Sequence, residues 1–155
     1  MNNTFQIDTL RPAQGAIERY LPFVGRLLIA AIFLWSGWRK LGMPGSVMAQ
    51  IASGGMPHPQ IGYALSLLAE LGAGGLLVLG LQTRLAAGGL AIFTLATALM
   101  FHANWAQPPQ LVNFMKNVAM IGGLAQVVAF GAGPISLDAW RARRRDPEVR
   151  TGGAR

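Results

Sequence analysis

Apolar residues are gathered into four long blocks, which are separated by short polar segments and cover residues 21–41, 61–81, 85–101 and 111–131. A transmembrane helix needs about 17 to 25 mostly apolar residues to cross the hydrocarbon core of a bilayer. Each block is close to that length, and the pattern predicts membrane spans at about 21–41, 61–81, 84–102 and 111–131. The fold class that follows is all-α, an integral membrane four-helix bundle with short loops.

Polar and turn-forming residues occupy the rest of the chain. Residues 1–20 form a polar N-terminal segment and residues 132–155 a basic tail, and we expect both in the cytoplasm. The segment 42–60 is the only long connection between spans. Within it, Pro44 interrupts the first helix, and apolar residues at helical spacing, Val47, Met48 and Ile51, predict an interfacial half-helix.

The composition supports the membrane assignment and limits the available chemistry. Of 155 residues, 12% are charged, whereas a soluble domain usually carries about 25%. The chain has no cysteine, which excludes disulfides, thiolate metal sites and a dithiol relay within this chain. Redox chemistry would therefore need a bound cofactor. Residues 1–20 contain no apolar stretch, so we expect no cleavable signal before the first span.

The basic residues are distributed unevenly between the two sides of the predicted bundle. The net charge is +7, and six of the thirteen basic residues lie in the tail from 141 to 155. Ten of the thirteen fall on the side of the termini, and only Arg39, Lys40 and Lys116 fall opposite. By the positive-inside rule this predicts an N-in, C-in orientation. A basic tail beside a span also indicates the lipid bilayer and its anionic headgroups as partners, rather than nucleic acid.

Glu70 is the only acidic residue between positions 39 and 137, and it lies in the middle of the second apolar block. A carboxylate in hydrocarbon is costly, so it indicates a functional site whose partner must be found. At the helical rise of 1.5 Å per residue, Glu70 lies about 13 Å below the outer boundary. Lys116 and Arg26 are then about 6 to 8 Å from its depth, whereas Lys40 is more than about 10 Å away and ranks third as a partner.

Helical spacing places other polar side chains near Glu70. One stripe of the second span holds Tyr63, Ser66, Glu70 and Gly74, and one stripe of the first holds Arg26, Ala30, Phe33, Gly37 and Lys40. We expect both stripes to face the interior of the bundle. The fourth span begins with polar residues, and His102 ends the third at a similar outward depth. The candidate site is therefore an outward-facing polar pocket formed by Glu70, Lys116, Arg26, Tyr63, His102, Asn113 and Asn117.

Two interpretations of Glu70 stay open at this point. An ion pair with a basic residue can serve only to fix the register of the helices. The same carboxylate can instead carry a proton or bind a cofactor. No metal site is expected, because His58 lies in a proline-flanked loop and nothing sets its distance from His102.

Several short segments occur in a characteristic order and spacing between residues 21 and 131. They are the first span with Arg26, Phe33, Gly37 and Lys40-Leu41, the loop Gly54-Gly55-Met56-Pro57, the segment Ala69-Glu70-Leu71-Gly72, the turn Gly80-Leu81-Gln82-Thr83-Arg84, the pair Phe101-His102, and Phe114-Met115-Lys116-Asn117. Together they resemble the DoxX family of small four-helix membrane proteins. The resemblance implies a four-helix bundle in the bacterial inner membrane.

The resemblance also implies a functional class. Members of this family are similar to the membrane subunits of thiosulfate:quinone oxidoreductases, and others are associated with oxidative-stress complexes that contain a sulfurtransferase or a superoxide dismutase. We therefore expect a membrane subunit with partner subunits and with quinone as the candidate cofactor. Hydrogen-bond donors for a quinone would come from His102, Lys116, Asn113 and Tyr63, and Glu70 would supply the proton route.

The alternative function is non-catalytic. More distant relatives of the family act as assembly factors for other membrane proteins, which implies a protein that assembles, anchors or stabilises its partners. Glu70 would then form a structural ion pair. A carrier of protons or small solutes ranks last, because four short helices give only a narrow path.

Overall fold

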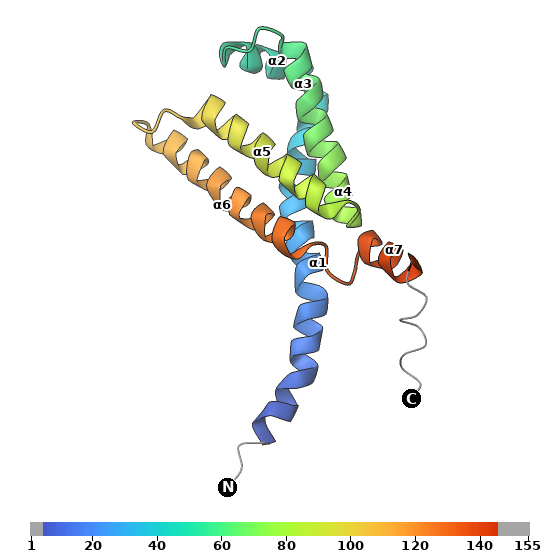
Figure 1. Cartoon of the computed structure of the whole chain (residues 1–155). Coiled ribbons are helices and arrows are strands. Elements are labelled where there is room, and N and C mark those ends of the chain that lie inside the picture. The colour runs from blue at the N-terminus through green and yellow to red at the C-terminus, as the bar shows by residue number, and fades with distance from the viewer. Residues whose placement is uncertain (1–4, 146–155) are drawn as a thin grey trace.

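The computed structural model describes the backbone of residues 5–145 and the side chains of residues 15–145. Over this range the chain forms helices and no strand (Figure 1). Four stretches of helix are long and apolar enough to cross a membrane, namely Gly15–Gly42, Pro59–Leu79, Thr83–His102 and Pro108–Phe130. The predicted all-α fold with four candidate membrane spans is therefore confirmed.

The first helix, α1 (Phe5–Gly42), is much longer than the predicted first span. Its apolar block was expected to begin at position 21, but the helix already includes residues that were expected to form a polar segment. The sequence from 13 to 19 contains alanine, glutamine, glutamate and arginine, which all favour helix. The start of an apolar block therefore marks a change in polarity and not the start of the helix.

The long connection folds back over the bundle as a short helix, α2 (Pro44–Ser53). Pro44 occupies the first turn of α2, where a missing amide hydrogen costs nothing, and Ile51 is buried beneath the helix. The end of α2 packs closely on α5, because a Cβ at Gly54 would lie only 2.8 Å from the Phe101 ring. The short helix predicted in this connection is confirmed.

The second span is one continuous rod with an irregular middle. It consists of α3 (Pro59–Leu67), a π-helical segment η1 (Leu68–Ala73) and α4 (Gly74–Leu79). A π-helical turn inserts one extra residue per turn and is found frequently at functional sites. Glu70 lies inside η1 and is buried there. The sequence pattern did not predict this irregularity.

The third and fourth spans, α5 (Thr83–His102) and α6 (Pro108–Phe130), form a hairpin that packs along most of its length. The end of this hairpin that holds Thr83 and Phe130 joins the other helices through a core of fully buried leucines, Leu77, Leu90 and Leu124. At the other end α5 and α6 lean away from α1 and α3 (Figure 1). The bundle is therefore closely packed at one end and more open at the other.

The predicted interior stripes of the first two spans are confirmed. Ala30, Phe33 and Gly37 of α1 are buried, as are Ser66 and Glu70 of the second span. Since each stripe follows a spacing of three or four residues, a single helical periodicity was enough to identify them.

The tail forms one more helix, α7 (Leu137–Arg145), where the sequence predicted only a basic segment. The chain leaves α6 through Gly131 and Gly133, both at positive φ, and then turns back toward the junction between α4 and α5. Figure 1 shows α7 beside the end of α4.

Candidate functional site

Glu70 lies at the centre of a small polar network between α1 and η1. The residue is only 5% exposed. Oxygen Oε1 accepts a hydrogen bond from the Ser36 hydroxyl at 3.1 Å and forms an ion pair with the Lys40 ammonium. The second oxygen, Oε2, is buried and has no hydrogen-bond partner among the described residues. Because a buried unpaired oxygen is costly, this atom can accept a hydrogen bond from a bound molecule.

Lys40 and not Lys116 or Arg26 is the partner of Glu70, so the predicted order of partners was wrong. The depth estimate treated the spans as parallel rods with equal starting levels. Gly37 lets α1 approach η1 closely, since a Cβ there would lie 2.7 Å from the side chain of Leu71. The last turn of α1 therefore lies beside Glu70, and the long lysine side chain covers the remaining distance.

Tyr63 supports this network from the second span. Its hydroxyl donates a hydrogen bond to the backbone carbonyl of Lys40 at 3.2 Å. The last carbonyls of a helix have no partner within the helix, so this contact stabilises the end of α1. Tyr63 therefore helps to position Lys40 and is not one of the residues that line the cavity.

Arg26 belongs to a different cluster at the closed end of the bundle. Its guanidinium donates to the carbonyl of Leu77 at 2.5 Å and to that of Ile135 at 2.6 Å. These contacts tie the end of α4 to the segment before α7. Arg26 is 1% exposed, and such a buried position suits a guanidinium that bridges carbonyls on two chain segments.

The polar residues predicted on the outer ends of the third and fourth spans are divided by the structure. His102 and Asn117 line the same cavity as Glu70, whereas Lys116 and Asn113 do not. Lys116 is exposed on α6. The ring nitrogen Nδ1 of His102 lies 2.7 Å from the side-chain oxygen of Gln110, which fixes the orientation of the imidazole. The predicted pocket therefore keeps Glu70, His102 and Asn117.

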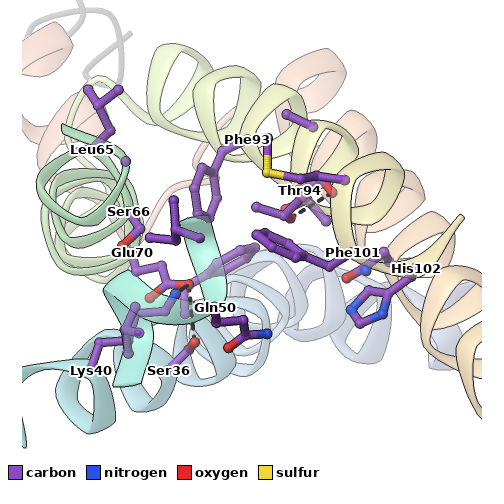
Figure 2. Close-up of a pocket in the computed structure, with 18 of the residues that line it drawn as sticks. Ser36, Lys40, Gln50, Leu65, Ser66, Glu70, Phe93, Thr94, Phe101 and His102 are labelled. Atoms are coloured by element: carbon purple, nitrogen blue, oxygen red, sulfur yellow. Dashed lines mark hydrogen bonds and ion pairs between the residues drawn. The ribbon is translucent and has the colours of Figure 1, made fainter. Parts of the chain in front are cut away.

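The cavity itself has a volume of about 560 Å³. Its walls come from α1, α2, α3, η1, α5 and α6, and its apolar surface includes Phe33, Ile51, Phe93, Met100, Phe101 and Met120. Figure 2 shows Ser36, Lys40 and Glu70 together on one side and His102 on the other, with Phe101 between them. The site is a mostly apolar chamber with the Lys40–Glu70 pair at one end and His102 at the other.

Sequence reasoning missed four polar residues of this cavity, namely Ser36, Gln50, Thr94 and Thr97. Ser36 lies one helical turn before Lys40, so the stripe that contains Lys40 could have included it. Gln50 lies on α2, and its place in the wall depends on how the connection folds back. No local pattern indicates that contact.

A second cluster, also missed, surrounds Asp138 in the first turn of α7. Its carboxylate accepts hydrogen bonds from the backbone amides of Gln82 and Thr83 at 2.8 and 2.9 Å, and from the Thr83 hydroxyl at 2.8 Å. Burial raises the pKa of Asp138, but these hydrogen bonds and the charge of Arg141 outweigh burial and leave the pKa below its ordinary value. Ser136 lies two residues before Asp138. A serine followed by an acidic residue in the first turn is a sequence signal of a helix start, and it would have indicated α7.

No three side chains of the His, Asp or Glu type lie close enough to hold a metal ion anywhere in the described part of the chain.

Four candidate membrane spans, a π-helical turn with a buried carboxylate and a cavity between the helices define a small polytopic membrane protein with an internal polar site. The DoxX family model matches residues 21–103, and the chain belongs to the DoxX family. The predicted family is thus confirmed.

Two curated relatives come from Escherichia coli (strain K12). The chain is 35% identical over 130 residues to "Inner membrane protein YphA", a match that covers 80% of this chain and 92% of the relative. It is 34% identical over 116 residues to "Inner membrane protein YqjF", with 74% and 87% covered. No solved structure matches the chain.

Proposed function

We propose that this DoxX-family protein resides in the bacterial inner membrane and binds a quinone head group in the cavity beside Glu70, as the membrane subunit of a quinone-linked oxidoreductase or oxidative-stress complex. The inner-membrane location is supported by the names of both curated relatives. The observation that carries the ligand proposal is the buried Glu70 carboxylate, which lines the cavity with one oxygen unpaired. That oxygen can accept a hydrogen bond from a hydroxyl of the reduced quinol form.

The size and lining of the cavity fit a small amphiphilic molecule. Ligand sites are usually about 300 to 1,000 Å³ and mostly apolar, with a few polar groups that fix orientation. At about 560 Å³ the cavity lies within this range. Its Lys40–Glu70 pair and His102 lie on opposite sides (Figure 2). A flat ring with an oxygen at either end would match that arrangement.

The residues in the cavity can hold a quinone in a defined way. Lys40 has further N–H donors beyond the one directed at Glu70, and Gln50 and Asn117 have amide donors. These groups can donate to the two quinone oxygens, while Phe93 and Phe101 pack against the ring. A bound quinone supplies two-electron redox chemistry, and the protein supplies position and protons.

Electron transfer in this proposal requires a partner subunit. The chain has no cysteine, so the electron donor would bind to, or be carried by, another protein. Glu70 and Lys40 form an ion pair in the wall of the cavity. Together they can hold and release a proton at the ligand.

The second candidate is an assembly or stabilising function without catalysis. The observation that favours it is that the same groups connect helices: Lys40 and Ser36 of α1 both contact Glu70, and Tyr63 contacts the backbone of α1. Polar contacts of this kind hold membrane helices in register. In this case the cavity would stay without a specific ligand.

The two candidates are separated by what the protein retains on purification. The full-length protein is extracted from its own membranes in mild detergent, and the bound small molecules are identified by mass spectrometry. We expect quinone to be recovered in a fixed ratio to protein, well above its ratio in an unrelated membrane protein purified in the same way. Recovery at the level of that control contradicts the quinone proposal and favours the structural one.

A further inference from the structure

Helix α7 is held at the end of the membrane-spanning bundle by specific contacts. The Asp138 carboxylate binds the first amides of α5, and the Asp138 amide donates to the carbonyl of Gly80 at 2.9 Å. Since α5 is a candidate membrane span that begins at Thr83, these contacts place the start of α7 at the level where that span begins. The helix is therefore fixed at the membrane boundary on the side of the chain termini.

The exposed side of α7 combines apolar and basic residues. Leu137, Trp140 and Arg144 follow each other at spacings of three and four residues and so share one face. Leu137 is 37% exposed and Trp140 is 44% exposed. The guanidinium of Arg144 lies 3.9 Å from the centre of the Trp140 ring, and the exposed Arg141 lies next to this face. A tryptophan with adjacent arginines is typical of a membrane interface.

Among the described residues, neither acidic group near α7 forms an ion pair with Arg141 or Arg144. Asp138 accepts three hydrogen bonds from Gln82 and Thr83, although it also attracts Arg141. Glu18 lines a separate hollow between α1 and α7, together with Arg19 and Arg143. Arg143 lines that hollow. Arg141 and Arg144 are therefore the two arginines that border the apolar face.

We propose that the face formed by Leu137, Trp140, Arg141 and Arg144 binds the headgroup of an anionic phospholipid. The phosphate contacts the two guanidiniums, which can each donate two hydrogen bonds to its oxygens. Leu137 and Trp140 enter the region between the headgroups and the acyl chains. Contacts of Asp138 with the α4–α5 turn orient α7 for this binding, so the site is built into the fold and is independent of any ligand near Glu70.

The test uses the full-length protein in detergent and native mass spectrometry, with phosphatidylglycerol and phosphatidylcholine of the same acyl chains titrated separately. The wild type should bind phosphatidylglycerol in preference to phosphatidylcholine. In the double variant Arg141→Gln/Arg144→Gln, the ratio of the two lipid affinities should be about tenfold smaller than in wild type. The reason is that each arginine near a lipid surface contributes substantially to the attraction of anionic lipid. The matched control is Arg39→Gln/Lys116→Gln, which removes the same charge from exposed positions elsewhere and should keep the preference.

Three results would overturn the proposal. An equal affinity of the wild type for both lipids excludes an anionic site. An equal loss in both double variants shows that the attraction follows net charge and not α7. If the α7 variant keeps its lipid preference but loses a co-purifying acidic protein, the face binds a protein partner instead. Thermal melting of both variants checks that the bundle is intact, and Trp140→Phe, which keeps the charge, should weaken binding less than the arginine substitutions.

Discussion

The ammonium of Lys40, in the last turn of α1, forms an ion pair with the carboxylate of Glu70 in the π-helical turn of the second span. This contact joins two helices whose close approach depends on Gly37. It also places the two charged groups in the wall of the cavity (Figure 2). Under the proposed function, stability and ligand binding would depend on the same pair of residues.

Lys40→Met should destabilise the protein, because it leaves the buried Glu70 without a counter-charge. We expect a loss of about 1 to 3 kcal/mol in the free energy of unfolding, measured by denaturant titration in detergent micelles. Adding Glu70→Gln to this variant should restore part of the loss, since the unpaired charge is then removed. Arg39→Met, at the neighbouring exposed position, is the control. Equal effects of the two methionine substitutions would mean that the ion pair has no stabilising role.

Gly80 should not tolerate a side chain. It has a φ of +65°, and a Cβ would lie 2.5 Å from Ser136 Cβ and 2.6 Å from Arg26 Nη1. Gly80→Ala should therefore lower the free energy of unfolding by about 1 to 3 kcal/mol. Gly75→Ala on the same helix, where a Cβ meets nothing within 4 Å, should be neutral or slightly stabilising. Comparable melting temperatures for both variants would contradict the packing of Ser136 and Arg26 against Gly80.

Asp138 should make stability depend on pH in the acidic range. Its pKa is lowered in the folded protein, so its contribution is fully present above the ordinary carboxyl pKa of about 3.9 and is lost as pH falls through the lower, folded value. Asp138→Asn should cost about 1 kcal/mol at neutral pH, as for the loss of a helix N-cap. In melting temperatures measured from pH 7 to pH 3, the difference between wild type and variant should shrink once the pH falls below about 3.9. A constant difference across this range would show that ionised Asp138 is not the stabilising species.

Both termini should lie in the cytoplasm. Ten of the thirteen basic residues fall on the side of the termini, and the described arginines there include the exposed Arg84, Arg141 and Arg144. A phosphatase or fluorescent reporter fused after Arg155 should report a cytoplasmic position. Periplasmic phosphatase activity would reverse the proposed orientation, while the helical fold would remain as described.

Most of the fold could be predicted from the sequence because hydrophobic length and helical spacing act locally. The four spans, the short helix after Pro44 and the buried positions of Ala30, Phe33 and Ser66 follow from these patterns. The partner of Glu70 could not be predicted in this way. It depends on the close approach of two helices at Gly37. Gly37 and Glu70 are 33 residues apart in the sequence, so no local pattern relates them.

The same distinction applies to the missed features. The π-helical turn at Glu70 is a local departure from the regular period, and no residue type marks it clearly. The docking of Asp138 onto Thr83 joins positions that are 55 residues apart. Local patterns could place a helix start near Ser136, but they could not show which surface that helix contacts.

The most direct measurement of the central claim is the affinity of a short-chain quinone analogue for the purified protein, compared between wild type, Glu70→Gln and Lys116→Gln. With the analogue in its reduced quinol form, whose hydroxyl can donate to Glu70, we expect saturable binding to wild type and to Lys116→Gln, and binding weakened by at least about tenfold in Glu70→Gln, since a hydrogen bond to a buried charged group contributes about 1.5 to 3 kcal/mol. A folded Glu70→Gln protein with unchanged affinity, or a wild type that binds no analogue, would contradict a quinone site beside Glu70.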